Sequence, residues 1–532
     1  MFGKTKKDGY KVVLTANRTL MSQYNGLIFL GFGACMTKGL IPDSLYYNIF
    51  CPSIDANKDG SAVKAPSGTR KIESTLLNNG FKEDEVIVAH PDHLDKVIGE
   101  NTKVLSITEF DPLGVGPATS TFTQLFGGEA YMKAKFKEIL DHPLVQKYKP
   151  KIIIGGPGGW QLEDNQVREN LGIDCVIIGE GEGVINPVFE NACNDKEIIP
   201  LIHGKPVPID EIPLIKKPTI DGVIEIARGC GRGCKFCNPT LQRYRCLSLE
   251  HILKEVDINL KAGIRPILHS EDVLRYKAKG FTVNKEAVID LFRQVRGYPG
   301  VDEVGISHFA LSSVYNAPDV VEEISNILEV DKNAWFSGQT GIETGSPRLI
   351  KDNMAGKVKP YKSEDWPYIV ENAFQILSDN NWVPVSTLII GLPGEKDEDI
   401  QSTIDLIDNL SEFKSIIVPL FFVSQGGFKD KNSFNFKNST KKECELFFKC
   451  WSHSLSWSKV LLKEYFDMSD DNIIKARLAE KTFSYIANRS NKALDKCLDE
   501  YDYNLPRILQ AAEEGELTII PKPLQAIIST IT

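Results

Sequence analysis

The strongest constraint on the fold is an alternation of short β-branched or aliphatic runs with longer mixed segments. Up to about residue 190 these runs fall at residues 11–15, 85–90, 104–108, 152–155 and 175–179. Near-continuous apolar runs of this length are typical of strands that are buried on both faces of a parallel sheet. Because helical segments separate the runs, the pattern predicts a doubly wound, Rossmann-like α/β domain.

Glycine and acidic residues follow three of these predicted strands. They lie at residues 111–114, 155–159 and 179–182. In open α/β sheets, ligands bind outside the carboxyl ends of the strands, where such turns are found. The sequence therefore predicts a ligand site at this edge of the first sheet.

A second series of strands and helices follows a proline-rich segment. Residues 195–221 carry five prolines, a density that predicts an extended connector. Strands are then predicted at residues 223–227, 266–270, 303–308, 335–341, 384–390 and 415–420, with helices at 249–260, 285–295, 319–328, 366–377 and 398–407. Six strands with intervening helices predict a partial (β/α) barrel that is open on one side.

The chain is therefore expected to contain four regions. These are a Rossmann-like domain at residues 1–194, a linker at 195–221, a partial barrel at 222–435 and a helical C-terminal domain at 436–532. An amphipathic pattern from residue 441 through Ile474 and Leu494 predicts the last of these. Trp451, His453 and Trp457 are interpreted as packing residues of this cap.

Composition excludes several classes of partner. The 532 residues include 42% hydrophobic and 25% charged residues, which is ordinary for a globular protein. A net charge of -9 argues against a nucleic-acid partner or an anionic membrane. The longest apolar run, residues 26–35, is about half of the roughly 20 residues that span a bilayer. Eleven cysteines, an odd number, predict a reducing compartment, and we expect a cytoplasmic protein.

Three cysteines form a C-x3-C-x2-C motif in a glycine-rich loop after the first predicted barrel strand. Cys230, Cys234 and Cys237 can hold three irons of a [4Fe-4S] cluster and leave the fourth iron open to a ligand. Phe236 is expected to shield the cluster from water. The alternative is a zinc site, which needs four ligands and would have to recruit Cys246.

This motif resembles the signature of the radical S-adenosylmethionine (SAM) superfamily, C-x3-C-x-(aromatic)-C. Residues 341–346 and 389–395 are similar to the family's segments at the ends of the fourth and fifth strands. At the second strand end the family usually has a glycine pair before glutamate, whereas this chain has His269-Ser270-Glu271-Asp272. The resemblance implies SAM contacts from Phe236, Glu271, Asp272, Ser307, Glu343, Thr344, Gly391 and Leu392.

The N-terminal domain resembles the cobalamin-binding domain of the B12-dependent radical SAM branch. Typical domains of this kind carry D-x-H-x-x-G after the first strand, and its histidine binds cobalt. Here the first strand is followed by Ala16-Asn17-Arg18-Thr19, so that histidine is missing. The resemblance implies cobalamin contacts from Asn17, Ser106, Thr108, Leu113, Gly114, Gly155, Gly156, Pro157, Gly179, Glu180 and Glu182.

The resemblance implies a methyltransferase that uses a [4Fe-4S] cluster, SAM and methylcobalamin. In such enzymes a 5'-deoxyadenosyl radical removes hydrogen from an unactivated sp3 carbon, which then takes a methyl group. Residues 15–131 resemble archaeal members from methanogens, of which one group methylates a glutamine in methyl-coenzyme M reductase. A protein or peptide substrate and an electron donor such as a ferredoxin are the implied partners.

Three alternatives to methyl transfer follow from the same residues. A B12-dependent radical SAM enzyme could instead catalyse ring rearrangement or cyclisation. A methylthiotransferase has a similar barrel, but it needs a second cysteine cluster in its N-terminal domain, and Cys35, Cys51, Cys175 and Cys193 lack close spacing. A non-catalytic corrinoid or iron-sulfur carrier would not need the SAM segments.

Overall fold

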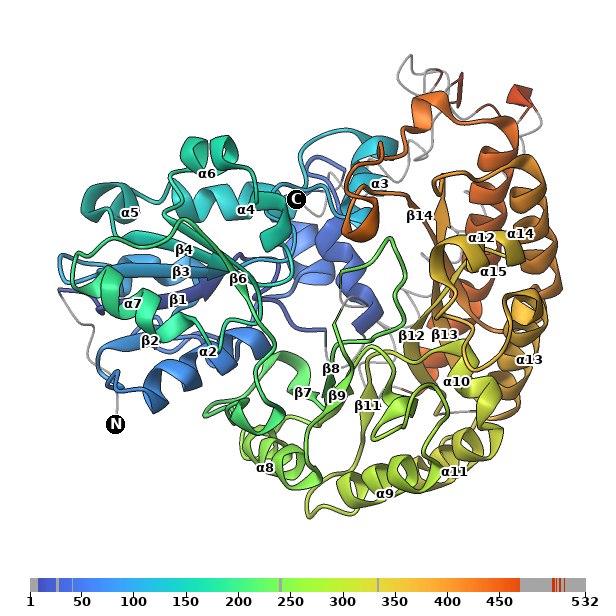
Figure 1. Cartoon of the computed structure of the whole chain (residues 1–532), viewed down its shortest axis with the longest axis horizontal. Coiled ribbons are helices and arrows are strands. Elements are labelled where there is room, and N and C mark those ends of the chain that lie inside the picture. Colours follow the sequence, from blue (N-terminus) through green and yellow to red (C-terminus); the bar gives the residue numbers. More distant parts are fainter. Residues whose placement is uncertain are drawn as a thin grey trace. The chain divides into compact units, whose positions relative to one another are not determined.

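The computed structural model describes residues 8–24, 28–40, 42–238, 242–332, 334–468, 500–502, 504, 507–508 and 511. Two compact units are distinguished by their internal contacts (Figure 1). The first comprises Met1–Ile226, Cys246–Leu268 and Tyr298–Val304, and the second comprises Ala227–Arg245, His269–Gly297 and Gly305–Thr532. A short piece of the predicted barrel, including its first helix, therefore packs with the N-terminal sheet.

The first unit is built on a parallel sheet with the order β2-β1-β3-β4-β5-β6. This order reverses direction between β1 and β3, as in doubly wound domains. All five predicted strands are present, and each begins and ends within two residues of its predicted range. The strands are β1 (Val12–Ala16), β2 (Val86–Val88), β3 (Val104–Thr108), β4 (Lys151–Gly155), β5 (Cys175–Gly179) and β6 (Leu201–Gly204).

Helices cover both faces of this sheet (Figure 1). Alternate residues of β1 enter different cores, with Leu14 in one apolar cluster and Val13 in the other. The Leu14 cluster includes Leu76 of α2 (Ser67–Asn78) and Phe189 of α7 (Ile185–Cys193). The opposite cluster includes residues of α4 (Tyr131–Leu140) and α5 (Pro143–Tyr148). Further helical segments of this part of the chain are η1 (Ile28–Cys35), α1 (Asp43–Leu45), η2 (Tyr46–Phe50), η3 (Pro91–Lys96), α3 (Pro117–Phe126), η4 (Gly159–Leu162), α6 (Asn165–Leu171), η5 (Ile209–Glu211) and η6 (Ile220–Gly222).

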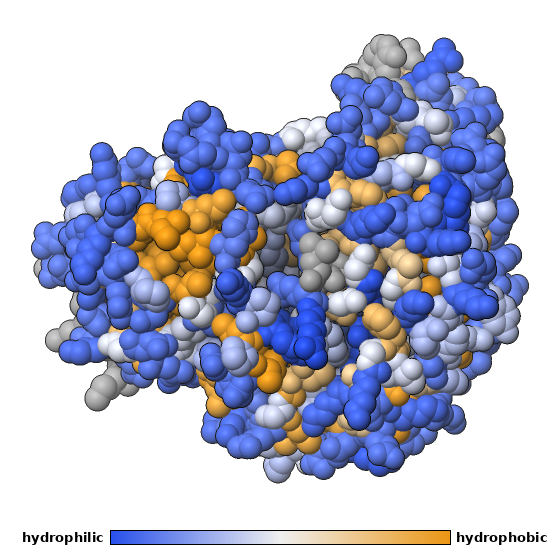
Figure 2. All heavy atoms as spheres, in the orientation of Figure 1, coloured by the Kyte–Doolittle hydropathy of each residue, from blue (hydrophilic) through white to orange (hydrophobic). Residues whose placement is uncertain are grey.

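The segment predicted as an extended connector contributes a sixth strand. β6 pairs only with β5 and lies at the edge of the sheet, a position that prolines on either side of it permit. Leu201 and Ile202 are partly exposed there, and Ile199 is 66% exposed. Figure 2 shows apolar side chains gathered on the first unit in the region where Figure 1 draws this strand.

The second series of predicted elements is also observed. The strands are β7 (Val223–Glu225), β8 (Ala227–Arg228), β9 (Arg245–Cys246), β10 (Ile267–His269), β11 (Gly305–Ile306), β12 (Phe336–Glu343), β13 (Trp382–Ile390) and β14 (Ile416–Phe421). β12, β13 and β14 form a parallel sheet in that order. The helices are α8 (Leu249–Leu260), α9 (Lys285–Arg296), α10 (Leu311–Asn316), α11 (Pro318–Leu328), α12 (Pro347–Met354), α13 (Trp366–Asp379) and α14 (Asp397–Asn409).

Polar caps fix the starts of several of these helices. The side chains of Ser248, Asn284 and Ser346 accept hydrogen bonds from backbone amides in the first turns of α8, α9 and α12. Such caps satisfy amides that have no partner within the helix. Each capping residue is the last residue of the loop that precedes its helix, so the same hydrogen bond also holds the end of that loop.

The C-terminal region begins with α15 (Lys441–Met468). Within it, His453 is 8% exposed and its Nε2 lies 2.8 Å from Ser415 Oγ, so this histidine packs in the core as expected. Ile474 and Leu494, which carried the rest of the helical prediction, lie outside the described residues. A search of the described helices for an apolar segment long enough to cross a membrane finds none.

Candidate active site

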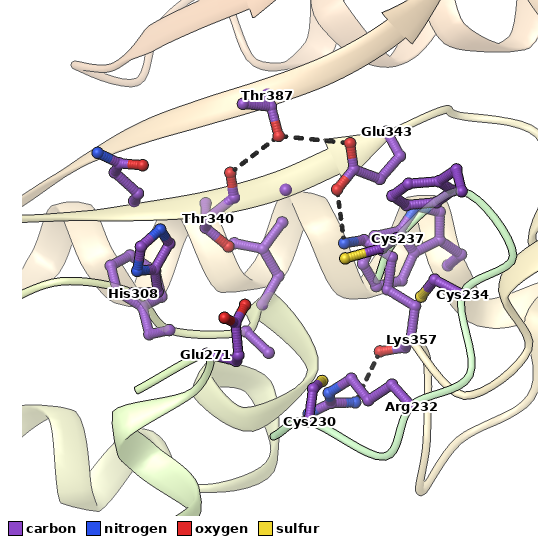
Figure 3. A pocket seen from close by; sticks show the side chains of 17 residues that line it. Cys230, Arg232, Cys234, Cys237, Glu271, His308, Thr340, Glu343, Lys357 and Thr387 are labelled. Atoms are coloured by element: carbon purple, nitrogen blue, oxygen red, sulfur yellow. Dashed lines mark hydrogen bonds and ion pairs between the residues drawn. The ribbon is translucent and has the colours of Figure 1, made fainter. Parts of the chain in front are cut away.

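One cavity in the second unit gathers the three cysteines of the motif. Cys230, Cys234 and Cys237 line it together with Phe236 from the same loop (Figure 3). Cys230 and Cys234 are 5% and 4% exposed, and the loop closes on itself where the Cys230 amide donates to the Gln242 carbonyl over 3.3 Å. The cavity thus brings together three thiols on a shielded loop, as the spacing predicts.

The donor set of the cavity fits a cluster better than a zinc ion. Cys246, which a zinc site would have to recruit as its fourth ligand, is not among the residues that line the cavity. A zinc ion would require its ligands to converge on one point, whereas each thiolate of a [4Fe-4S] cluster binds a different iron. The donor set therefore fits a cluster held by three cysteines.

A buried ion pair lies beside these cysteines. Lys357 Nζ is 2.9 Å from Glu343 Oε1, and both side chains are largely buried. Burial raises the pKa of the Cys234 thiol to about 11, and the positive charge of Lys357 acts to lower it. Burial acts to lower the pKa of Lys357, but Glu343 and Cys234 act to raise it, with a net rise. The pair thus places a fixed positive charge where a negatively charged cluster would be bound.

The backbone of β12 directs Glu343 into the cavity. The pairing of β12 with β13 shifts register between Gly341 and Glu343, which marks a β-bulge, and Glu343 has a φ of 62°. Bulges re-aim side chains near functional sites. A Cβ atom at Gly341 would collide with the Glu343 carboxylate, so a larger residue there would displace the Glu343 side chain. Thr387 on β13 donates a hydrogen bond to Glu343 Oε2 over 3.3 Å.

The loop that carries the cysteines is tied to the rest of the unit by Arg232. Its guanidinium donates to Asp272 Oδ2 over 2.8 Å and to the carbonyl oxygens of Gly356 and Lys357 over 3.0 Å each. Arg232 and Asp272 are buried, and Ser313 also donates to Asp272. These bonds make Arg232 a residue that positions the cysteine loop.

The cavity wall on the other side from Lys357 is polar. Figure 3 shows Glu271, His308 and Thr340 on this wall. Burial raises the pKa of Glu271 and lowers the pKa of His308 to about 4. His308 Nδ1 and Thr340 Oγ1 are buried without a hydrogen-bond partner. These groups can therefore donate to or accept from a bound molecule.

The SAM contacts implied by the family resemblance divide into two sets. Phe236, Glu271 and Glu343 line the cavity. Asp272, Ser307 and Thr344 are nearly fully buried and bonded within the protein: Ser307 Oγ lies 2.8 Å from His269 Nδ1, and Thr344 Oγ1 lies 3.2 Å from Thr403 Oγ1. Gly391 and Leu392 form the turn after β13, where the Gly391 amide donates to Glu395, and they do not line the cavity.

Several cavity residues carry no motif that identifies them in the sequence. Lys357 follows α12 in a lysine-rich stretch, so its partner could not be inferred without the fold. His308 lies directly after Ser307, and the side chains of neighbouring residues in an extended segment point in opposite directions. Selecting one of the two required the register of β11 and β12.

The first unit offers a second candidate site at the carboxyl ends of β3, β4 and β5. On one face of the sheet Val104 and Ile153 are buried in the core, whereas Ser106, Thr108 and Gly155 further along the same strands are partly exposed. A Cβ at Gly155 would meet nothing closer than 4.0 Å. Small side chains thus leave this end of the sheet uncovered, as a flat cofactor would require.

The other implied cobalamin contacts lie around this edge. Gly156, Pro157 and Gly179 are exposed turn residues, and Leu113, Gly114 and Glu182 are partly exposed. Glu180 is 6% exposed and accepts a hydrogen bond from the Val207 amide. Asn17 is fully buried: its Oδ1 accepts from the Thr19 amide and hydroxyl, and its Nδ2 donates to Glu109.

Comparison with known proteins agrees with this description. Residues 224–407 match the radical SAM superfamily, so the chain contains a radical SAM domain. An uncharacterized methyltransferase of Pyrococcus horikoshii, PH0819, is 27% identical over 57% of this chain and 66% of its own length. The ribosomal protein uS12 methylthiotransferase RimO of Thermotoga maritima is 29% identical over 35% of this chain and 41% of its own length. The chain thus spans less than two thirds of either relative.

The fold also resembles solved structures of one methyltransferase. TsrM from Kitasatospora setae, with tryptophan and a SAM analogue bound, superposes with a TM-score of 0.51 over 79% of this chain and 74% of TsrM, at 12% identity. The same enzyme with cobalamin and a [4Fe-4S] cluster bound gives a TM-score of 0.50 over 82% and 75% of the two chains. At this identity the likeness concerns the fold alone.

Proposed function

We propose that this protein is a cobalamin-dependent radical SAM methyltransferase that methylates an unactivated sp3 carbon. The observation that carries the proposal is the convergence of Cys230, Cys234, Cys237 and Glu343 on one cavity of the radical SAM domain. In this proposal the second unit is a partial (β/α) barrel, with the cavity at the ends of its strands.

The cofactors would supply the difficult chemistry: the reduced cluster and SAM provide a 5'-deoxyadenosyl radical, and methylcobalamin provides the methyl group. The protein's own residues hold and shield these groups. Burial of the cysteines and the indole of Trp366, which also lines the cavity, excludes water from the site. Lys357 offers a positive charge to the cluster or to the carboxylate of SAM, and Glu343 orients Lys357.

The corrinoid is proposed to bind at the carboxyl edge of the first sheet. Support comes from the strand order, from the uncovered surface at Ser106, Thr108 and Gly155, and from the fold shared with TsrM, which has been solved with cobalamin bound. Because Asn17 is buried and bonded within the protein, the residue after β1 provides no axial ligand for cobalt. A weakly held lower ligand favours reduction of the corrinoid to the state that accepts a methyl group.

We further propose a protein or peptide substrate, with a glutamine of methyl-coenzyme M reductase as the first candidate. The polar wall of Glu271, His308 and Thr340, on which His308 Nδ1 and Thr340 Oγ1 have no hydrogen-bond partner, suits a neutral polar group such as a carboxamide. The net charge of -9 favours a neutral or basic substrate segment. A ferredoxin-like protein in the cytoplasm of an archaeal methanogen would supply the electrons.

Methylthio transfer is a second candidate, since RimO is among the relatives. That reaction class needs a second cysteine cluster in the N-terminal domain. Cys175 and Cys193 instead belong to the apolar core of the first sheet, and burial raises their pKa values to about 12 and about 11. These thiols are core residues, which disfavours this candidate.

The proposal is tested with SAM that carries a trideuterated methyl group. The protein, reconstituted anaerobically with iron, sulfide and hydroxocobalamin, is reduced and incubated with peptide pools that include the glutamine segment of methyl-coenzyme M reductase. We expect a peptide with a deuterated methyl group on carbon, formed only when corrinoid is present. A methylthio product, or methylation that persists without corrinoid, would contradict the proposal.

A further inference from the structure

The segment that follows β3 exposes an unusual amount of apolar surface. Among the described residues, six large apolar side chains are well exposed, and three of the six lie within residues 110–126. These are Phe110 at 51%, Val115 at 41% and Phe126 at 37% exposure. Phe110 is the most exposed of the three, and it directly follows β3 at the edge of the sheet where doubly wound domains bind ligands.

The loop is held rigidly in this conformation. The carboxylate of Asp111, which is 1% exposed, accepts hydrogen bonds from the amides of Val115 and Gly116 and from the side chain of Gln161 over 2.7 to 3.1 Å. Gln161 in turn accepts from the Leu113 amide over 2.9 Å. A loop that is fixed by buried polar groups while its apolar side chains face outward is organised in advance for a ligand.

The backbone at Phe110 is fixed as well. The Glu109 amide donates to the Gly155 carbonyl over 2.8 Å, and the Gly158 amide donates to the Glu109 carbonyl over 2.9 Å. A Cβ at Gly158 would lie only 2.4 Å from the carbonyl oxygen of Phe110, so the two loops touch through backbone atoms. The Phe110 ring is therefore presented from a defined position and cannot fold inward without disrupting these contacts.

A second observation beside Phe110 also points to a ligand. Glu109 is fully buried, and its Oε2 accepts a hydrogen bond from Asn17 Nδ2 over 2.7 Å, but its Oε1 has no partner. Burial raises the pKa of this carboxyl well above its usual range. A buried polar atom without a partner is rare in native proteins and calls for a missing group.

Glu109 and Phe110 lie at the point where the strand order reverses. β3 lies between β1 and β4 in the sheet. The chain leaves β1 toward β2 on one side and leaves β3 toward β4 on the other side. This is where doubly wound sheets bind their ligands. The exposed Phe110 ring calls for a ligand with a broad apolar face, and the unpartnered Glu109 Oε1 calls for a polar group at the rim of that ligand. A corrin ring has such a face and carries amide groups at its rim.

We propose that Phe110 packs against one face of the corrin ring of cobalamin, and that Glu109 Oε1 forms a hydrogen bond with an amide at the ring's edge. The inference rests on the proposed function. It adds Phe110 and Glu109 as corrin contacts in a domain that lacks the cobalt-binding histidine of the D-x-H-x-x-G pattern. Phe110 offers no metal ligand, so the cobalt face it covers stays without an axial ligand from this position. Neither residue belongs to the pattern by which cobalamin domains are recognised in sequence.

The test measures cobalamin binding by the full chain. Equilibrium dialysis with hydroxocobalamin is compared for the wild-type protein, Phe110→Ala, Phe110→Leu and Ile199→Ala, which removes an exposed apolar side chain from the region of β6. We expect Phe110→Ala to bind at least about tenfold more weakly, Phe110→Leu to stay near wild type, and Ile199→Ala to be unchanged. Thermal melting shows that each variant is folded.

A spectroscopic measurement separates contact with the ring from a general structural effect. The EPR spectrum of bound cob(II)alamin is recorded for wild type and for Phe110→His. If the Phe110 side chain lies over cobalt in the wild type, the imidazole that replaces it in Phe110→His coordinates cobalt and adds nitrogen splitting to the EPR spectrum. An unchanged spectrum in Phe110→His would overturn the inference, as would unchanged affinity in Phe110→Ala.

The same dialysis distinguishes failure of the inference from failure of the proposed function. If wild-type protein binds no hydroxocobalamin, the corrinoid part of the proposed function is wrong and this inference falls with it. If the wild type binds hydroxocobalamin and Phe110→Ala does so equally, only the inference is wrong. Binding of flavin mononucleotide in place of hydroxocobalamin, lost in Phe110→Ala, would show that this surface serves another flat cofactor and would overturn the corrin assignment.

Discussion

Lys357 and Glu343 form a buried ion pair with 2.9 Å between Nζ and Oε1, on the wall of the cavity that the three motif cysteines also line. The two residues come from different elements: Glu343 ends β12 at a bulge, and Lys357 follows α12. Their pairing joins the end of β12 to the segment after α12, whose backbone carbonyls at Gly356 and Lys357 accept hydrogen bonds from Arg232 of the cysteine loop.

Substitution of Lys357 by methionine is expected to destabilise the protein by about 3–5 kcal/mol, because it leaves the buried Glu343 carboxylate without its positively charged partner. The free energy of unfolding is measured in guanidinium chloride. The matched control is Lys285→Met, whose partner Asp319 is exposed, and we expect a change below about 1 kcal/mol. Equal losses in the two variants would contradict the importance assigned to the buried pair.

Arg232 provides a second test of buried charge. Arg232→Met removes the donor to Asp272 and to two backbone carbonyls, and we expect a loss of about 3–5 kcal/mol in the free energy of unfolding. Arg232→Lys keeps the charge but not the planar fork, so it should also be clearly destabilised. Arg293→Met, at an exposed pair with Glu323, is the control for loss of a surface arginine. A fully stable Arg232→Lys would contradict the role of the fork.

Metal content distinguishes the cluster from a zinc site. After anaerobic reconstitution with iron and sulfide, the wild type is expected to hold about four irons, and Cys230→Ser, Cys234→Ser and Cys237→Ser should each lose most of them. Cys246→Ser is the matched variant, since this partly buried cysteine would be needed as a fourth zinc ligand. Iron and zinc are counted by mass spectrometry. Loss of metal in Cys246→Ser to the same degree would contradict a three-cysteine cluster.

The buried His453 predicts a pH dependence of stability. Burial lowers its pKa to about 4, whereas a histidine in the unfolded chain titrates near about 6.5. Between these values only the unfolded chain binds the proton, so the contribution of His453 is full above pH ~6.5 and is lost on acidification by up to about 1.4 kcal/mol per pH unit.

His453→Gln keeps a hydrogen-bonding group near Ser415 but removes this titration. The difference in unfolding free energy between wild type and variant should therefore shift in favour of the variant as the pH falls from 7 to 4.5. His203→Gln, at a site that is 62% exposed, should run parallel to the wild type. Parallel curves for His453→Gln and the wild type would contradict the assignment.

The sequence predicted most of the strands because their hydrophobic runs are local signals. β3 and β5 match the predicted ranges, and α8 matches residue for residue. β6 was not predicted because prolines at positions 200 and 206 flank it, and a short edge strand carries no strong pattern. Its existence depends on the open edge of β5, which is a tertiary property.

The sequence predicted residues of the candidate site only where they belong to a recognisable motif. The cysteine spacing identified three cavity residues, and the family resemblance added Glu271 and Glu343. Lys357 and His308 were missed because their side-chain directions follow from strand register and loop packing. Glu109 and Phe110 were missed for a related reason, since neither exposure of an aromatic ring nor an unpartnered carboxyl oxygen can be read from the sequence.

The most direct test of the account is the cleavage of SAM by the reconstituted, reduced protein. With trideuterated methyl SAM we expect 5'-deoxyadenosine that disappears in a Cys230→Ala, Cys234→Ala, Cys237→Ala variant, together with a deuterated methyl group on the bound corrinoid. Protein that holds both cofactors and yields neither 5'-deoxyadenosine nor labelled methylcobalamin, also in the presence of the peptide pools, would contradict the account and would indicate a carrier without catalytic function.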